Sequence, residues 1–545
     1  MDIDRARIVP ARPVSVRSWW LAVPPAVFIA VFFAWPTLAL IARGVGEAGT
    51  ATMPWPRIAD ATLTTLWLAG IGTVLTLAVG LPATWALFRR PWRGSRVLIA
   101  LVTVPFVLPT IVVATAFRAL VNDSALGASD WGATLTILAA LVFFNIAVVV
   151  RIVGPVWASL DDRAYYAART LGASHWRAVW HVRVPALTPA LAAAAATVWL
   201  FCSASFGVVI VIGGGTVSTI DTEIWLQANW FLNLSAAAVL GILQIVVIAV
   251  TLWVVSRLRA RHSGAWKSRA HGTAHGLPTA RERMVVALGL APAVALLVAP
   301  AVALVHRSLT VDGGLGVAHY TQAFSGDLLA GTGSSAVSAA GRSLGIAVVV
   351  GFTATVLALA AAVVISRRPR GGLLYGALLL PLGVSSVVVG LGSLLTLARP
   401  LPGGFSLVEN QLLMPVAHTI IALPLAASVI VPAMRGIDPA LLNSAASLGA
   451  SPWRVWTHVE WPLVRRSTAM AAGLAAAVSL GEFGAATFLA RPGTETLPVL
   501  IFRLLGRPGS ESVGLAFALA VILAVLTAAL MLAADNRKLE AVVNP

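Results

Sequence analysis

Charged residues are scarce in this sequence. Only 11% of its 545 residues are Asp, Glu, Lys or Arg, whereas 59% are hydrophobic and the mean hydropathy is +0.89. Soluble domains do not have this composition, which predicts an all-α polytopic membrane protein. Cysteine is scarcer still. The single Cys202 lies in an apolar segment, so a framework of disulfides within the chain is excluded.

The sequence also lacks the motifs of catalysis and cofactor binding. It has no Gly-x(4)-Gly-Lys-Ser/Thr loop for ATP, and no His, Cys and Glu residues at the spacing of metal ligands. His262, His271 and His275 are irregularly spaced in a polar stretch, where we expect them to be solvated. We therefore predict that the chain is not an enzyme and has no metal site and no cofactor.

The excess of basic residues does not indicate a nucleic-acid partner. The formal charge is +17, from 38 Lys and Arg against 21 Asp and Glu. These basic residues form short clusters between apolar runs instead of a basic surface interleaved with aromatic residues, so a nucleic-acid partner is excluded.

About twelve apolar segments, six in each half of the chain, predict two repeats of membrane spans. The first repeat extends over 19–257 and the second over 284–534, with a basic tail at 1–18, a polar linker at 258–283 and a short tail at 535–545. The first segment is too long for the apolar core of a signal peptide, so we expect it to be retained. The segments lie near 19–41, 63–88, 97–121, 133–158, 187–212, 235–257, 284–306, 343–366, 372–398, 411–433, 465–489 and 513–534.

The distribution of basic residues predicts the orientation. With both termini on one side of the membrane, roughly 28 of the 38 Lys and Arg fall on that side and about nine on the other. That side is expected to be the cytoplasm, with the chain in the inner membrane of a bacterium. An even number of spans in each half makes the two halves parallel repeats.

The strongest internal match lies in two loops, 162–185 and 438–462. Leu-Gly-Ala-Ser occurs at 171–174 and again at 448–451, so equivalent residues are 277 positions apart (449 − 172). The same offset relates Trp176-Arg177 to Trp453-Arg454, His181 to His458 and Pro185 to Pro462. The chain is therefore a duplication.

Each loop carries the signals of two short helices joined by a glycine. Asp438-Pro439 and Ser451-Pro452 each place an N-cap side chain before a proline at the first helical position. Gly172 and Gly449 stand where a residue of left-handed conformation closes the first helix. By the orientation above, both loops face the cytoplasm.

These loops resemble the E-A-A-x(3)-G loop of bacterial ABC importer permeases. An Ala-Ala pair precedes each glycine, although the acidic first residue of the motif is absent from both copies. In that family the loop docks into a cleft on a cytoplasmic ATPase. The resemblance therefore implies a partner ATPase dimer that binds the ATP, and an extracytoplasmic solute-binding protein. It assigns ATPase coupling to the equivalent residues Ala167, Ala168, Leu171, Gly172, Ala445, Ala446, Leu448 and Gly449.

With two permease halves in one chain, the sequence resembles the thiamine and ferric-iron branch of these importers. Ser205-Phe206-Gly207 matches Glu482-Phe483-Gly484 at the offset of 277, and 479–486 is similar to the wider group of these importers that handles thiamine, ferric iron, sulfate and molybdate. The run of 204–206, 212–215 and 219–220 looks most like thiamine permeases. We expect thiamine or thiamine phosphate as the solute, with ferric iron as the alternative.

Glu482 and Ser205 are the candidate residues of the translocation pathway. An acid inside an apolar span costs at least ~2.5 kcal/mol unless it faces water or a partner. We expect Glu482 on the surface between the halves with Ser205 facing it, where it either lines the pathway or has a structural role, capping a neighbouring loop or pairing with an arginine. Trp225, Trp230 and Phe231 near the outer loops could stack a cationic heterocycle, although an interfacial belt would also place tryptophans there.

A secondary transporter with twelve spans is the main alternative class. Its strongest internal match would be expected after the second and eighth spans, where this sequence has only basic clusters at 89–96 and 367–372. Proline-bearing segments at 105–109 and 381–386 also interrupt equivalent spans, where they either bend the span around the pathway or only contribute to packing.

Overall fold

The computed structural model describes residues 18–47, 53–88, 94–103, 108–121, 124, 129–160, 163–262, 279–329, 333–367, 371–400 and 404–534. The two tails, most of the linker 258–283 and Asp162 at the start of the first loop lie outside these ranges. Within them the chain is helical apart from one short hairpin, β1 (Thr310–Val311) and β2 (Gly314–Leu315). Its turn is Asp312-Gly313, with φ of +48° and +82°.

The chain is a polytopic helical membrane protein. Nine helices of the described part are long and apolar enough to cross a membrane, or ten if one bent pair counts as a single span. The expected count of twelve is therefore not confirmed. One predicted segment absent from the nine is 372–398, which in the structure is the bent pair Gly371–Gly383 and Ser386–Leu397. The predicted segment 187–212 is two helices, Val184–Ser203 and Phe206–Gly213, separated at Ala204 and Ser205.

The two halves repeat the same order of helices at the offset of 277. In the first half these helices are α3 (Trp55–Phe88), α4 (Ser95–Thr103), α5 (Thr110–Val121), α6 (Asp130–Ala158), α7 (Arg163–Thr170), α8 (His175–Ala178), the π-helical turn η4 (Val179–Arg183), α9 (Val184–Ser203), α10 (Phe206–Gly213), α11 (Ile220–Asn229) and α12 (Leu234–His262). Their counterparts are α15 (Ala336–Arg367), α16 (Gly371–Leu379), α17 (Ser386–Leu397), α18 (Leu413–Arg435), α19 (Pro439–Ser447), α20 (Pro452–Val455), η6 (Trp456–Glu460), α21 (Trp461–Leu480), α22 (Gly484–Leu489), α23 (Leu497–Leu505) and α24 (Ser510–Ala534).

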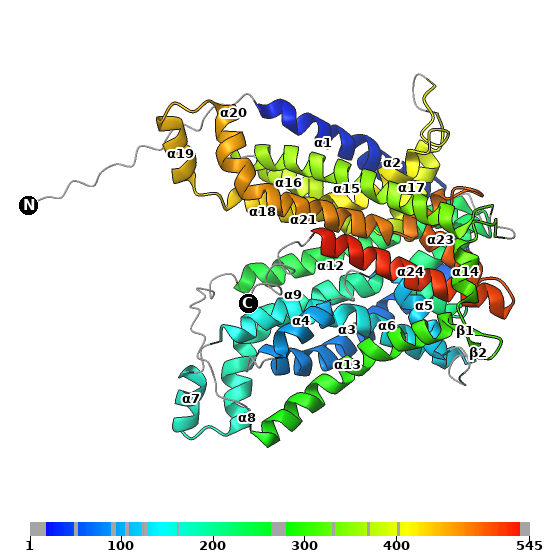
Figure 1. Ribbon diagram of the computed structural model, residues 1–545. Helices are drawn as coiled ribbons and strands as arrows, with labels where there is room; N and C mark the ends of the chain where they lie inside the picture. Colours follow the sequence, from blue (N-terminus) through cyan, green and yellow to red (C-terminus); the bar gives the residue numbers. More distant parts are fainter. Residues whose placement is uncertain are drawn as a thin grey trace, which may run out of the picture.

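Each half begins with a helix that packs on the other half. The chain starts with η1 (Ser18–Ala22), α1 (Val23–Phe28), η2 (Ile29–Ala34) and α2 (Trp35–Glu47), which lie against α15, α16, α17 and α18 of the second half. The second half starts with α13 (Ala280–Ser308), which packs on α3 and α5 of the first half and on α24. Figure 1 shows the exchange, with blue α1 on the upper half and green α13 on the lower. A short helix, α14 (Ala318–Phe324), follows the hairpin.

The second-half span with a proline break is bent, as its sequence predicts. Helix α16 continues into the 3₁₀ turn η5 (Leu380–Gly383), and the axis turns by 98° before α17. The corresponding first-half segment 104–107 lies outside the described residues. Ser385 begins α17 as its N-cap and accepts a hydrogen bond from the amide of Val388.

The predicted loops of both halves lie at the same end of the molecule. In Figure 1, α7 and α8 lie at the lower left and α19 and α20 at the upper left, while the hairpin, α14 and α23 lie at the opposite end. The duplicated loops are therefore placed to contact one partner from one side.

Candidate translocation pathway and coupling loops

Both loops fold as the sequence predicts. Gly172 and Gly449 have φ of +88° and +78°, the left-handed conformation that glycine adopts without strain. The backbone amides of the next residues, Ala173 and Ala450, each donate a hydrogen bond to the carbonyl five residues earlier in the chain, at 3.0 and 3.1 Å. These hydrogen bonds close α7 and α19 in the same manner.

The second short helix of each loop begins at a serine N-cap. The hydroxyl of Ser174 accepts a hydrogen bond from the amide of Arg177 at 3.2 Å, and that of Ser451 accepts one from the amide of Arg454 at 3.4 Å. Asp438 caps α19 in addition, through the amide of Ala440 at 2.8 Å. Each loop is therefore a pair of short capped helices with a defined shape. A π-helical turn joins it to a long span.

Apolar side chains are exposed at equivalent positions of the two loops. Leu171 and Leu448 are each 88% exposed, and Trp176 and Trp453 are 70% and 72% exposed. Among the other expected coupling residues, Ala167 is exposed, while Ala168, Ala445 and Ala446 are half-buried. An apolar patch repeated at one end of the molecule, outside the long helices, is typical of a protein-docking surface.

The two loops are anchored differently to the rest of the chain. In the first, the Tyr165 hydroxyl and the His175 Nδ1 are 2.7 Å apart, and the Arg183 guanidinium lies 3.7 Å from the Tyr165 ring centre. In the second, Glu460 replaces the equivalent arginine and forms an ion pair with Arg367 at the end of α15. The first loop is thus braced by aromatic stacking and the second by charge.

The halves meet in a cluster of four aromatic rings, which we call the aromatic cluster. Phe206 stacks on Phe483, its equivalent at the 277 offset, with ring centres 5.3 Å apart and an interplanar angle of 19°. Phe502 lies 5.2 Å from Phe483 and 5.7 Å from Trp225, which is the equivalent of Phe502. Each half therefore supplies one ring of each pair. The sequence reasoning missed the pair of Trp225 and Phe502, although the same offset identifies it.

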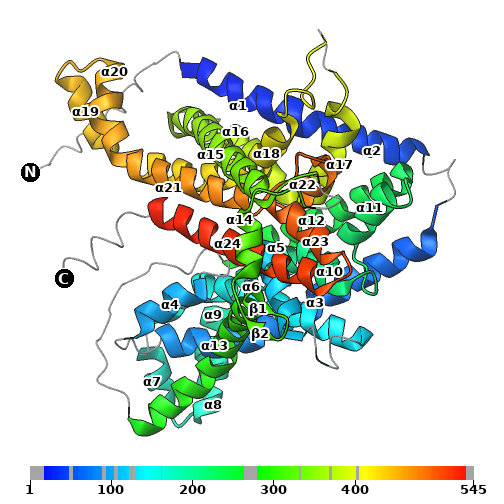
Figure 2. The ribbon, with the colours of Figure 1, turned by 45° about the vertical axis from the view of Figure 1, so that its right-hand side comes forward.

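Small residues allow the helices at this interface to approach closely. A Cβ on Gly481 would lie 3.1 Å from Pro109 of the first half, and one on Gly207 would lie 2.7 Å from the Thr110 hydroxyl. Figure 2 shows α10, α11, α17, α22 and α23 gathered where the halves meet. Phe206 and Phe483 are buried, so the cluster closes the interface in this conformation.

Glu482 lies between Gly481 and Phe483, which contact the first half, and its own carboxylate is bound by the second half. Its carboxylate accepts a hydrogen bond from the amide of Ala485 at 3.0 Å, which caps α22, and another from the Ser386 hydroxyl. The Ser205 hydroxyl donates to the carbonyl of Cys202 at 2.8 Å. The two residues therefore approach through their neighbours Phe206 and Phe483.

A second buried acid joins the halves directly, and the sequence reasoning did not identify it. Asp221 on α11 is 1% exposed and accepts a hydrogen bond from the Ser385 hydroxyl of the second half at 2.8 Å. Burial raises the pKa of this carboxyl group to about 7. Nothing in the sequence distinguishes Asp221 from the nearby Glu223, which pairs within its own half with Gln227 at 2.7 Å.

The other aromatic residues of the predicted stacking group do not join the cluster. Trp230 is 74% exposed, and Phe231 lies 4.6 Å beneath the Arg57 guanidinium. Of the three, the structure brings only Trp225 to the interface between the halves.

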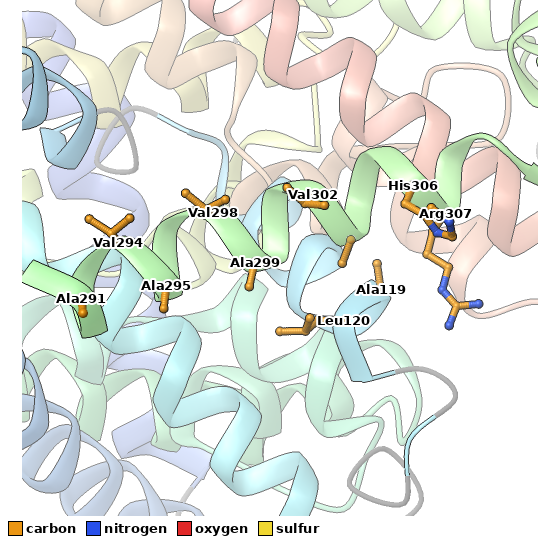
Figure 3. Close-up of a pocket in the computed structure, with 11 residues that line it drawn as sticks. Ala119, Leu120, Ala291, Val294, Ala295, Val298, Ala299, Val302, His306 and Arg307 are labelled. Carbon is orange, nitrogen blue, oxygen red and sulfur yellow. The ribbon is translucent and has the colours of Figure 1, made fainter.

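A wide groove lies elsewhere, on the outer surface between α5 and α13. It has a volume of about 830 Å³ and is lined by alanine, valine and leucine, with His306 and Arg307 at one end (Figure 3). It follows α13 along its exposed face and lies apart from the aromatic cluster. Its lining would face lipid chains in a membrane.

Comparison with known proteins identifies the class. Residues 72–263 match the family described as binding-protein-dependent transport system inner membrane component. The thiamine transport system permease protein ThiP of Brucella abortus is 26% identical over 496 residues, which cover 87% of this chain and 86% of that protein. The chain is an ABC importer permease with both halves fused.

Two other relatives support the same class. The ThiP protein of Haemophilus influenzae is 24% identical over 80% of this chain and 81% of its own length. The sulfate transport system permease protein CysT of Escherichia coli is 34% identical over 167 residues, which cover 29% of this chain and 60% of that protein. These relatives are all transport permease components.

Proposed function

We propose that this permease imports thiamine or thiamine phosphate. An extracytoplasmic binding protein delivers the solute, and a cytoplasmic ATPase dimer drives transport by docking on the loops at 163–185 and 438–462. The observation that carries the proposal is the pair of capped glycine-turn loops, each with a leucine that is 88% exposed, at one end of the molecule. Two equivalent levers suit a partner that is itself a dimer.

The solute pathway follows the interface between the halves. This conformation is closed, because the rings of Phe206 and Phe483 stack across that interface. Movement of the two loops would act on α9 and α21, which continue from them through π-helical turns and end directly before Ser205 and Glu482. A single helix in each half therefore connects the docking loop to one of the stacked rings, so that docking is coupled to separation of the rings.

The relatives named as thiamine permeases support thiamine as the solute. They match over both halves of this chain, as ThiP of Brucella abortus does over 87% of it. The basic linker and tails would then face the cytoplasm, with the loops on the same side.

Uptake of labelled thiamine should be compared in cells with and without this gene, with the genes of the ATPase and binding protein kept intact. We expect uptake to depend on the gene. Ferric iron and sulfate should be measured in the same cells. Loss of iron or sulfate uptake with thiamine uptake unchanged would reject the solute and leave the permease assignment intact.

A further inference from the structure

The turn between α11 and α12 exposes large apolar side chains at the end of the molecule opposite the loops at 163–185 and 438–462. Trp230 is 74% exposed, Leu232 is 76% exposed, and Phe231 between them is 47% exposed. Figure 2 shows α11 on the same side as α23, away from α7, α8, α19 and α20. Large apolar side chains exposed together in one turn are typical of a surface that contacts another molecule.

The backbone of this turn is strained at Leu232. Its φ is +53°, a left-handed conformation that a residue with a Cβ rarely adopts. Two hydrogen bonds impose the turn, from the amide of Phe231 to the carbonyl of Leu226 at 3.0 Å and from the amide of Asn233 to the carbonyl of Gln227 at 2.7 Å. The side chain of Leu232 is too exposed for its packing to offset the strain. Strained residues of this kind cluster at functional sites.

The second half has the same turn without the apolar side chains. At the offset of 277 its residues are Arg507, Pro508 and Gly509, and Gly509 also has a positive φ, of +109°. Glycine adopts such a conformation without the steric cost that a Cβ brings. The turn therefore forms without a leucine, and glycine would be the less strained residue at position 232. The leucine side chain must have a role other than shaping the turn.

The base of the turn is held by an aromatic ring and two charges. The Arg57 guanidinium lies 4.6 Å from the centre of the Phe231 ring and 3.8 Å from the carboxylate of Glu223. Glu223 is 3% exposed, so it is a fixed point within the first half. The side chains on either side of Phe231 therefore project from a turn of defined shape. A surface held in its binding conformation beforehand loses little conformational entropy when it is bound.

A membrane surface does not require this geometry. Trp131 at the start of α6 is 79% exposed and lies in a regular helix, as a tryptophan of an interfacial belt can. Lipid headgroups are fluid and adapt to a tryptophan on any backbone. A protein partner has a surface of fixed shape, which favours contact residues that are held in one conformation. The strained turn therefore fits a protein better than it fits lipid.

We infer that Trp230 and Leu232 form an apolar anchor by which the first half binds the extracytoplasmic solute-binding protein. The matching family is described as binding-protein-dependent, so such a protein is the partner expected at this end. It meets an apolar turn on the first half and a turn with Arg507 on the second, and this difference fixes its orientation on the duplicated permease. The inference rests on the proposed binding-protein partner and not on the identity of the solute.

Binding of the solute-binding protein encoded with this permease tests the anchor. Its dissociation constant would be measured on the complex of permease and ATPase in lipid nanodiscs. We expect Trp230→Ser to weaken binding roughly 30-fold, as truncation of an anchoring tryptophan does. Leu232→Gly should weaken binding roughly tenfold, while the unfolding midpoint stays the same or rises because the strain is relieved. Trp131→Ser is the matched control, with an equally exposed tryptophan on an unstrained helix, and should leave the dissociation constant unchanged.

The outcomes separate the anchor from a structural role and from the solute assignment. Weaker binding without a lower midpoint in Leu232→Gly supports the anchor, whereas a lower midpoint would show that the leucine stabilises the fold and would overturn it. Unchanged dissociation constants in Trp230→Ser and Leu232→Gly would also overturn it. Equal losses in Trp230→Ser and Trp131→Ser would show that both tryptophans act through the membrane, again against the anchor. If binding depends on Trp230 and Leu232 while cells import no thiamine, the anchor stands and only the solute assignment fails.

Discussion

Replacing Gly449 with valine should weaken docking of the ATPase and leave the membrane helices folded. The backbone at this position has a φ of +78°, which a β-branched residue adopts only with strain. Nothing lies within 4 Å of a Cβ built there, so the substitution causes no collision. The whole penalty is therefore conformational, and the same holds at Gly172, where φ is +88° and the surroundings are equally open.

The size of the effect follows from the cost of the left-handed conformation, about 1–2 kcal/mol for a residue with a Cβ. Since the free loop is exposed, it can relax to another shape and must return to the native one when it docks. The penalty then falls on docking and predicts a roughly 5- to 30-fold loss of affinity for the ATPase. The loops lie apart, so the penalties of Gly172→Val and Gly449→Val should add.

Co-purification of the ATPase at a series of ATPase concentrations, together with solute uptake, measures this effect. Gly449→Asn is the control, because asparagine tolerates positive φ better than other residues with a side chain. The expected order of affinity is glycine, asparagine, alanine, valine. Equal assembly and uptake for valine and glycine at both positions would refute the claim that the loops dock in the conformation seen here.

Three further outcomes are expected. Leu448→Ser should reduce co-purification of the ATPase without changing the unfolding midpoint, since the side chain is 88% exposed, whereas Leu441→Ser on the same helix, where the leucine is 50% exposed, should have a smaller effect on assembly. Arg367→Met should cost about 3 kcal/mol in stability and lower the unfolding midpoint more than Glu460→Gln does. It leaves the Glu460 carboxylate, which is 3% exposed, without its partner, whereas Arg367 is 25% exposed and can be hydrated when Glu460 is replaced. Equal shifts would contradict this order. Burial raises the pKa of Asp221 from its usual acidic range to about 7, so folding binds a proton and stability should fall as the pH rises from about 4 to about 7. Asp221→Asn should flatten that part of a profile of midpoint against pH, and an unchanged profile would disprove it.

The loops were predictable because their signals are local. A cap residue, a proline and a glycine each act within one helical turn, so Asp438, Ser451 and Gly449 specify their conformations without help from distant segments. Because equivalent residues of the two halves are separated by a fixed offset, a conformation predicted in one loop also predicted the conformation of the other.

Contacts between the halves were only partly predictable. The sequence placed Glu482 at the interface through the cost of a charge in an apolar span, and that reasoning depends on composition alone. The contact of Asp221 with Ser385 joins residues 164 positions apart, and no local pattern encodes it. The count of twelve spans was not confirmed among the described residues, because hydropathy does not give the angle of 98° between Gly371–Gly383 and Ser386–Leu397.

The exchange of first helices has a consequence for how the protein is made. As the chain leaves the ribosome, residues 18–47 enter the membrane before α15, α16 and α17 of the second half have been synthesised, and α2 can pack first only on α12 of its own half. The rest of this helix lies in lipid without its second-half partners, and the surface of α3 and α5 stays open until α13 arrives. Neither half can finish folding alone, so a ribosome that stops in the linker leaves an incomplete first half with two unfilled surfaces. Co-expression of the two halves as separate chains should let each supply the helix that the other lacks.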